Sequence, residues 1–393
     1  MYSFFVRERV RDLVLGTALL LSIAGLLLFP TESMAAAREG LTLCFNVIIP
    51  SLFPFFVLSS LVVDLGLYAY PSRLLEPVMR PLFHVGGSCC TALVLGFIGG
   101  YPVGAKTAIE LYKNGLATRT ETERLLAFCN NSGPAFILGV VGAGIFSSTK
   151  VGLLLYCAHA LASLCVGLLF RFYKGGEQAK TDEKQGQLFH VKHFTTALTD
   201  CIKNSFSSVL NICAFVLFFT VVLRLLFCSG FLPLMADFLG RLFAPVGFDR
   251  IWAQKLLTGV LELSSGVASL SNGGNLSASV SMAAFMLGWA GISVHCQVLS
   301  FLSGSGLSGK TYVLGKLLHG GISAGLVWGF TRIFPLAQPV SVILSDQIAA
   351  LTALEFSAVF IHSAVAAFLL LLVFLLLAFS CGKKRKAVIQ CRK

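Results

Sequence analysis

Long apolar runs alternate with short polar connections along most of the chain. Eight of these runs approach or exceed the roughly 20 residues that a helix needs to cross a bilayer core about 30 Å thick. They lie near residues 11–29, 43–66, 124–146, 151–171, 206–228, 280–302, 312–334 and 356–380. The pattern predicts an all-α polytopic membrane protein with about eight transmembrane helices.

Two further apolar stretches, 82–112 and 242–272, are interrupted in the middle by glycine-rich or polar sequence, and each predicts a re-entrant hairpin. The two halves of the chain correspond at an offset of about 160 residues, with Gly96 opposite Gly259 and the polar break at 130–133 opposite 291–293. Each half contains a helix, a hairpin, a broken helix and a further helix. Because three crossings are an odd number, the second repeat is expected to be inverted, which is typical of secondary transporters.

The predicted organisation has five parts. They are an N-terminal transmembrane helix (1–35), a first repeat (36–172), a cytoplasmic linker (173–200), a second, inverted repeat (201–340) and a C-terminal transmembrane helix with a basic tail (341–393).

Composition excludes a soluble protein. Hydrophobic residues make up 56% of the chain and charged residues 12%, compared with about 25% charged residues in soluble domains. The net charge of +12 comes from basic residues between apolar runs and in the cluster 383–386, which favours a topological role over a nucleic-acid partner. All but about seven of the 30 basic residues fall on one predicted side, so both termini are expected in the cytoplasm, with Lys310 and Lys316 among the membrane-surface anchors.

The stretch SGSGLSGKTY, residues 303–312, matches the phosphate-binding pattern G-x-x-x-x-G-K-T. A working P-loop needs a strand before it and a helix after it in a βαβ unit, whereas apolar membrane segments flank this one. The stretch is therefore interpreted as a cytoplasmic turn. The 12 cysteines include no C-x-x-C pair, and no metal spacing or catalytic arrangement is found, so neither an enzyme nor a cofactor is predicted.

The first break is the run from Phe97 to Lys106, FIGGYPVGAK. Its glycines and its proline cannot continue an apolar helix, and a turn inside the membrane leaves polar backbone groups that must face protein or a wet cavity. Lys106 is expected either to face a cavity or to pair with Glu110 one turn on. The alternative interpretation is a packing kink with buried glycines.

The second break, Asn130-Asn131-Ser132-Gly133-Pro134, lies in the middle of a crossing. Asn or Ser before Pro is how a helix starts, so a half-helix from Pro134 is expected to point its positive end at the protein centre and to form an anion site. The alternative is an Asn pair that only bridges neighbouring helices.

The second half offers one acid in its hairpin, Glu262, with three roles left open: binding substrate hydroxyls, carrying a coupling proton, or pairing with Lys255 or Arg250. His295 and Gln297 face different sides of a helix, so at most one of them is expected to line the cavity. The full candidate substrate-binding set is Gly99, Gly100, Tyr101, Pro102, Lys106, Asn130, Asn131, Ser132, Gly133, Glu262, Ser264, Ser265, Ser293 and Gln297.

Three segments carry a family resemblance. GFIGGYPVGAKTAIELYKNGLATRTETERLLAFCNNSGPAFILGVVG, NVIIPSLFPFFVLSSLV and GISVHCQVLSFLSGSGLSGKTYVLGKLLHG resemble the YlbJ-like sporulation integral membrane protein family over roughly residues 40–335. That family contains the nucleoside-recognition gate domain and is similar to the concentrative nucleoside transporters, which have two re-entrant hairpins in an inverted repeat. The resemblance implies an endospore-forming bacterium and transport of dipicolinic acid across the outer forespore membrane, from the mother cell. The related transporters also suggest a homo-oligomer.

One departure from the nucleoside transporters bears on the substrate. Those proteins hold ribose hydroxyls with acidic hairpin residues, whereas the first tip here offers Tyr101, backbone N–H groups and Lys106. These groups suit the two carboxylates and the flat ring of dipicolinate better, although Glu262 fits only if it is protonated or serves ion coupling. The expectation is therefore a transporter of a small organic anion that works by alternating access. A nucleoside carrier of the same fold and a non-transporting envelope scaffold are the alternatives.

Overall fold

The computed structural model describes residues 2–67, 69–175, 194–271 and 275–334, together with residues 365 and 368. All regular structure within these ranges is helical, which confirms the all-α class. The last predicted crossing, near 356–380, and residues 176–193 of the predicted linker lie outside the described residues. Residues 194–200, also assigned to the linker, are instead the first turns of α9 (Phe194–Cys228).

Four helical segments of the described chain are long and apolar enough to cross a membrane: α8 (Thr149–Phe170), α9, the α13–α14 segment (Leu276–Leu302) and α15 (Lys310–Ile333). Two bent pairs, Gly16–Leu28 with Pro30–Asn46 and Ser72–Phe83 with Gly87–Gly99, raise this number to six if each pair is one span. The chain is therefore a multi-pass membrane protein.

The N-terminal region departs from the predicted crossings. The helix expected near residue 43 already begins at Pro30 and continues through α2 (Pro30–Leu43), η1 (Cys44–Ile48) and α3 (Ile49–Asp64). It meets α1 (Tyr2–Leu28) at a bend of 99°. Proline has no N–H to donate and is favoured in the first turn of a helix, and Pro30 is the first residue of α2.

The first predicted hairpin is present as a pair of packed helices, α5 (Cys90–Gly99) and α6 (Val103–Lys113). It follows α4 (Ala69–Phe83) and the short η2 turn (Gly87–Cys89). The two arms cross at glycines, since a Cβ atom on Gly96 would lie 3.1 Å from the Cα atom of Gly104 and would collide with the carbonyl oxygen of Cys129. Only glycine permits this close approach.

The second predicted hairpin is also present, as α11 (Arg250–Leu261) and the shorter α12 (Leu263–Ala268), preceded by α10 (Phe231–Phe243) and η5 (Ala244–Val246). Its arms again meet at glycines, because a Cβ atom on Gly266 would collide with the Cα atom of Gly259. Gly96 and Gly259, which correspond between the two halves of the sequence, thus both lie where two hairpin arms cross. The inverted relation between the halves stays a prediction.

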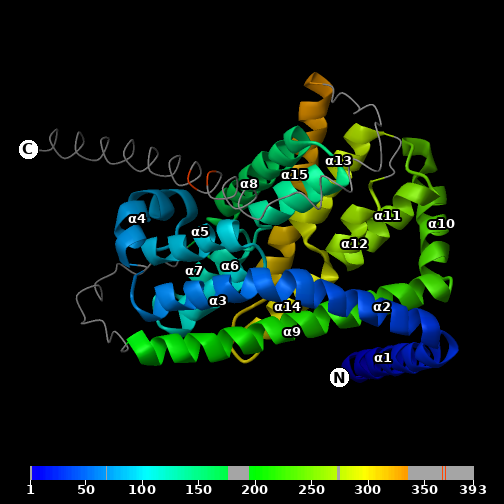
Figure 1. The fold of residues 1–393 in the computed structure, drawn as a ribbon, viewed down its shortest axis with the longest axis horizontal. Helices are drawn as coiled ribbons and strands as arrows, with labels where there is room; N and C mark the ends of the chain where they lie inside the picture. Colours follow the sequence, from blue (N-terminus) through cyan, green and yellow to red (C-terminus); the bar gives the residue numbers. More distant parts are fainter. Residues whose placement is uncertain are drawn as a thin grey trace, which may run out of the picture.

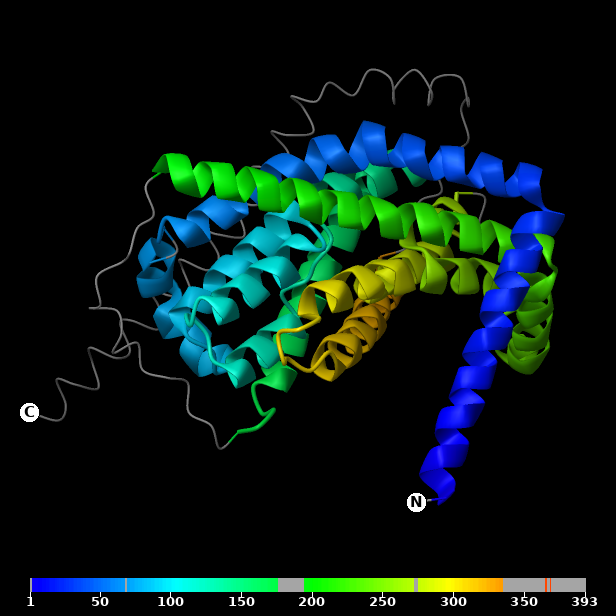
Figure 2. The same ribbon diagram turned by 90° about the horizontal axis from the view of Figure 1, so that it is seen from below.

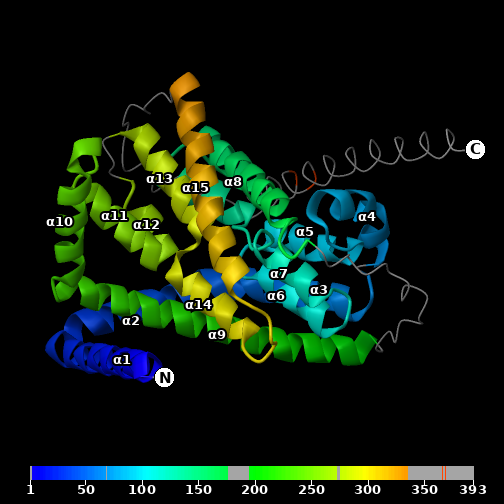
Figure 3. The same ribbon diagram turned by 180° about the vertical axis from the view of Figure 1, so that it is seen from behind.

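The helices fall into two groups around a shared centre (Figure 1). One end holds α4, α5, α6 and α7 (Arg119–Leu126), and the other end holds α10, α11 and α12, as Figure 3 shows from behind. Between them, α13 (Leu276–Trp289) and α8 pack along α15. Figure 2 shows α9 alongside α2 and α3, with α1 turned away from them. Tyr101, at the tip of the first hairpin, packs against both of the large buried cores and so lies at the junction of the two groups.

Candidate functional site

The predicted break in the first crossing is a real interruption of the helix. The chain leaves α7 at Leu126, and residues 130–133 have no regular structure before η3 (Ala135–Ile145) begins. Asn130, Asn131 and Ser132 are at most 1% exposed. One detail of the prediction is wrong: Pro134 is the N-cap of η3, and no side chain caps this helix. The amide of Asn131 donates to the carbonyl oxygen of Phe128 instead, and the hydroxyl of Ser132 has no partner among the described residues.

Each hairpin tip contacts the break in the broken helix that follows it. A Cβ atom on Gly100, whose φ is +78°, would lie 2.8 Å from the backbone nitrogen of Gly133. In the second half, a Cβ atom on Gly291, at φ +83°, would lie 3.0 Å from the backbone nitrogen of Leu263. The structure thus brings Gly99 to Pro102 together with the 130–133 break, and Glu262 together with the start of α14 (Gly291–Leu302).

A buried lysine that the sequence interpretation misplaced lies against the first break. Lys316 was expected to be a surface anchor, but it is 0% exposed, and its Nζ atom donates to the carbonyl oxygen of Asn130 at 2.9 Å. Lys316 lies almost two turns inside α15, on the face that packs against the break, whereas Lys310 at the helix start is exposed. Lys316 was expected at the surface because it lies close to a predicted loop in the sequence. That closeness does not show which face of the helix is buried.

Two histidines extend this contact into a closed polar cluster, which no sequence motif indicated. The Nζ atom of Lys316 lies 3.3 Å from Nδ1 of His319, and Nε2 of His319 lies 2.9 Å from the carbonyl oxygen of His159. The backbone N–H of Ser132 donates to Nε2 of His159 at 3.0 Å, which returns the chain of contacts to the break. The two imidazole rings are tilted, with centroids 4.3 Å apart. The term lysine–histidine cluster is used below for Lys316, His319, His159 and the break residues Asn130 and Ser132.

Aromatic rings surround the cluster. The ring of Tyr101 lies 5.5 Å from the Nζ atom of Lys316, and Nδ2 of Asn130 is 3.4 Å from the hydroxyl of Tyr312. His295 lies between Trp289 and Tyr312, with ring centroids 4.2 Å and 5.1 Å away. Of the pair His295 and Gln297, both of which are buried, His295 is therefore the one that joins this aromatic group.

Several buried polar atoms near the break have no hydrogen-bond partner among the described residues. They are Oδ1 of Asn130, Oδ1 of Asn131, Oγ of Ser132, Nδ1 of His159 and both ring nitrogens of His295. Buried polar groups in proteins are nearly always paired, so a concentration of unpaired ones marks a place that needs an explanation. Three of these atoms, on Asn130, Ser132 and His159, belong to the lysine–histidine cluster.

Lys106, the cation proposed from sequence, adopts one of its two expected arrangements. Its Nζ atom lies 3.7 Å from Oε1 of Glu110 and 4.4 Å from the centroid of the Phe56 ring. Ser60 also donates to Glu110, at 3.3 Å. Lys106 is 7% exposed and the side chain of Glu110 is 27% exposed, so this is a partly buried ion pair on the second arm of the first hairpin.

Glu262 caps the short helix α12. Its carboxylate oxygens accept hydrogen bonds from the backbone N–H groups of Ser264 at 3.0 Å and Ser265 at 2.7 Å. Neither basic residue considered as its partner is paired with it: Arg250 binds Asp237 at 3.0 Å, and Lys255 lies over the ring of Trp252. Ser293, in α14, is 1% exposed.

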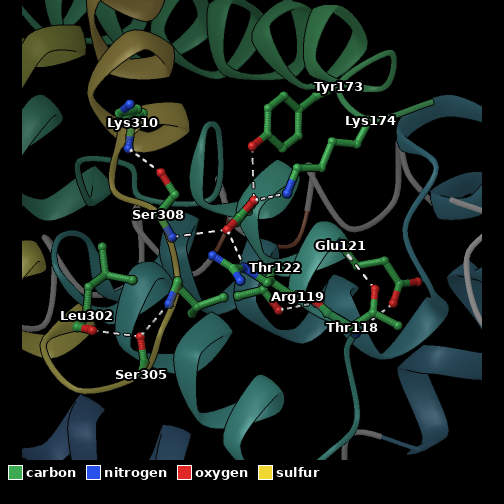
Figure 4. A network of polar contacts seen from close by, with 12 residues as sticks. Thr118, Arg119, Glu121, Thr122, Tyr173, Lys174, Leu302, Ser305, Ser308 and Lys310 are labelled. Atoms are coloured by element: carbon green, nitrogen blue, oxygen red, sulfur yellow. Dashed lines mark hydrogen bonds and ion pairs between the residues drawn. The ribbon is translucent and has the colours of Figure 1, made fainter. Parts of the chain in front are cut away.

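The loop that matches the P-loop pattern is held by a carboxylate. The backbone N–H of Ser308 donates to Oε1 of Glu123 at 3.0 Å, and no strand precedes this loop within the described chain. Glu123 is fully buried and also binds Nε of Arg119, the hydroxyl of Tyr173 and Nζ of Lys174 (Figure 4). The network joins the start of α7, the residues after α8 and the loop before α15. The distribution of basic residues along the sequence also predicts that these three connections lie on one side of the membrane. Which side of the membrane they face stays a prediction.

Comparison with known proteins places the chain in a family. The family model Gate, described as nucleoside recognition, matches residues 45–171. The chain is also 31% identical over 337 residues to the sporulation integral membrane protein YlbJ of Bacillus subtilis (strain 168), covering 81% of this chain and 83% of that protein. The chain belongs to the YlbJ family of sporulation integral membrane proteins. The Gate match contains the first hairpin, the break and His159, whereas Lys316 and His319 lie beyond it, so the lysine–histidine cluster of this YlbJ-family chain joins the matched region to the second half.

Proposed function

We propose that this YlbJ-family protein transports a small organic anion, dipicolinate, across the outer forespore membrane during sporulation. The observation that carries the proposal is the fully buried Lys316, which lies against the interrupted helix and forms no ion pair among the described residues. A buried cation is stable only with a compensating charge or good hydrogen bonds, so an anion is the natural ligand for this site.

The groups around Lys316 suit the chemistry of an aromatic dicarboxylate. The hydroxyl of Ser132 offers a donor to a carboxylate, and the rings of Tyr101, Tyr312 and His295 offer faces for a flat ligand. The candidate residues Asn130, Asn131, Ser132, Gly133 and Tyr101 are proposed to contact the substrate, joined by Lys316 and the two histidines.

Transport by alternating access is supported by the contacts between hairpin tips and breaks. Each tip approaches its break through backbone atoms at a positive-φ glycine, so a small displacement of the hairpin would open the buried cluster. In this proposal the two hairpins, α5–α6 and α11–α12, move relative to the remaining helices.

A nucleoside is the rival substrate, because the matched Gate model is described as nucleoside recognition. A neutral nucleoside has no negative charge to pair with the side chain of Lys316. The carboxylate of Glu262 is also occupied by the N–H groups of α12, so it is not free to hold ribose hydroxyls without uncapping that helix.

Thermal stability of the purified protein separates these substrates. A ligand that binds only the folded state at 100 times its Kd stabilises that state by about 2.7 kcal/mol. Dipicolinate is expected to raise the unfolding temperature in detergent and uridine is not; the reverse result would establish the nucleoside rival.

Deletion of the gene in its host is expected to give spores poor in dipicolinate while the mother cell still makes it. Normal spore content, with no stabilisation by either ligand, would favour the scaffold.

A further inference from the structure

The side-chain amine of Lys316 has two hydrogen-bond acceptors among the described residues. They are the carbonyl oxygen of Asn130 at 2.9 Å and Nδ1 of His319 at 3.3 Å. A charged ammonium group has three N–H donors, whereas a neutral amine has two donors and a lone pair. The observed partners match a neutral amine, and they leave the third N–H of an ammonium only the ring face of Tyr101, 5.5 Å from Nζ.

The partners of the two histidines fix their tautomers. A carbonyl oxygen only accepts, so Nε2 of His319, 2.9 Å from the carbonyl of His159, carries the hydrogen and Nδ1 is free to accept from Lys316. Nε2 of His159 receives the backbone N–H of Ser132 and so carries no hydrogen. Both rings are therefore neutral in this arrangement, and neither competes with Lys316 for positive charge.

No described group that faces Lys316 carries a negative charge at neutral pH. The titratable groups around it come from five elements: Tyr312 and His319 of α15, His159 of α8, His295 of α14, Tyr101 of the first hairpin tip and Cys129 of the break. An ammonium group enclosed in this way lacks a counter-charge, and burial of an uncompensated charge is strongly unfavourable. An incoming carboxylate would supply the missing charge.

We propose that one proton enters the site with each substrate anion and resides on the Nζ atom of Lys316, so that anion and proton are carried together. The inference rests on the proposed function for its anion. The proton comes from water on the side of entry, adds to the lone pair of the amine, and returns to water when the anion leaves on the other side. His159 and His319 keep their single protons throughout and hold the amine in place.

Coupling of this kind is reciprocal. If the anion favours the protonated amine, protonation strengthens anion binding by the same factor. A dianion carried with one proton moves one net negative charge. Uptake is therefore expected to weaken as the pH rises on the side of entry.

Calorimetry of the full-length protein in detergent tests the inference. Dipicolinate is titrated at pH 7 in PIPES, HEPES and Tris, which differ in their enthalpy of ionisation. The slope of the binding enthalpy against that enthalpy is expected to give about one proton taken up per anion. Lys316→Arg, whose side chain is always charged, is expected to bind without proton uptake. Lys310→Arg, on the exposed start of the same helix, is the matched control and keeps the wild-type slope.

The outcomes separate the two proposals. Binding of dipicolinate by the wild-type protein with a slope of zero would overturn proton coupling and leave the proposed function standing. Absence of any binding would overturn both. If Lys316→Arg does not fold, the wild-type slope still decides, and Lys316→Met is the second variant. It is expected to bind dipicolinate about tenfold more weakly because a charge-assisted hydrogen bond is lost, and unchanged affinity would count against the role of Lys316.

Discussion

The Nζ atom of Lys316 donates to the carbonyl oxygen of Asn130 at 2.9 Å, and this contact fastens α15 to the interrupted helix of the first half. A helix that unwinds in a buried place leaves backbone groups without intrahelical partners, and such groups must be satisfied by other means. Lys316 and His159 supply two of these partners, one to a carbonyl and one to an N–H. The cluster therefore stabilises the break itself. Substitutions within the cluster are expected to affect folding as well as ligand binding.

Gly100→Ala is expected to destabilise the protein by roughly 2 to 4 kcal/mol, from positive-φ strain and from overpacking against the break. Its Cβ atom would lie 2.8 Å from the backbone nitrogen of Gly133. Gly115→Ala is the matched control, because Gly115 also has a positive φ, +72°, but has nothing within 4 Å of the added atom. The control should lose only about 1 kcal/mol. Thermal unfolding in detergent measures both, and equal losses would show that the tip is not packed against the break.

Glu262→Asn separates capping from proton coupling at the second hairpin. Asparagine is a good N-cap but cannot carry a proton, so a capping role predicts near-wild-type transport and abundance. Glu262→Ala removes the acceptor for two N–H groups and is expected to cost about 1 kcal/mol. Transport of labelled dipicolinate into vesicles, normalised to protein amount, is the measurement. Loss of transport in Glu262→Asn at normal abundance would contradict a role limited to capping and would support proton coupling by Glu262.

The positions of both breaks and both hairpins could be predicted from sequence because their signals are local. Glycine and proline clustered at 99–102 and 133–134 disfavour a continuous apolar helix, and polar residues in a long apolar run indicate a turn without any knowledge of neighbours. The capping of the half-helix was mispredicted because the hydrogen-bond partners of the break residues depend on the folded structure. Asn131 and Ser132 were expected to cap the helix that follows, but the amide of Asn131 donates to the carbonyl oxygen of Phe128, and the hydroxyl of Ser132 has no partner among the described residues.

The lysine–histidine cluster could not be predicted, because its members are far apart in sequence. His159 and His319 are separated by 160 residues and meet only through the packing of α8 against α15. In a membrane protein both the lipid-facing and the buried faces of a helix are apolar, so periodicity does not reveal which face a lone polar residue occupies. A lysine near the end of a span is normally a surface anchor, and only the contact with Asn130 shows that Lys316 is not.

Paired substitutions separate the ion pair of Lys106 from a role in substrate binding. Lys106→Met leaves the partly buried carboxylate of Glu110 with only the hydroxyl of Ser60 and is expected to cost roughly 1 to 3 kcal/mol, seen as lower abundance. Lys106→Met with Glu110→Leu removes both charges and should restore abundance. If Lys106 only pairs with Glu110, the double variant also transports dipicolinate. A double variant that is abundant but inactive would instead place Lys106 in the substrate path.

The pH dependence of stability should report the Glu123 network. Glu123 lies in α7, outside the helices long enough to span the membrane, and is held by Arg119, Lys174, Tyr173 and the backbone of Ser308. Burial raises the pKa of this carboxyl, but the hydrogen bonds, led by that from Ser308, bring the pKa below its usual value.

A carboxyl with a lowered pKa stabilises the folded state above its unfolded pKa, about 4.3, and loses that contribution as the pH falls through the folded value. The unfolding free energy lost in Glu123→Gln, roughly 1.5 to 3 kcal/mol, should therefore be constant from pH 8 to about pH 5 and shrink below about pH 4. Glu39→Gln is the control, since Glu39 is two-thirds exposed and its pair with Arg224 is open to solvent. It should show little loss at any pH, because exposed pairs contribute about 1 kcal/mol or less. A loss in Glu123→Gln that grew on acidification would mean that the carboxyl is protonated in the folded protein and that the loop before α15 is held in another way.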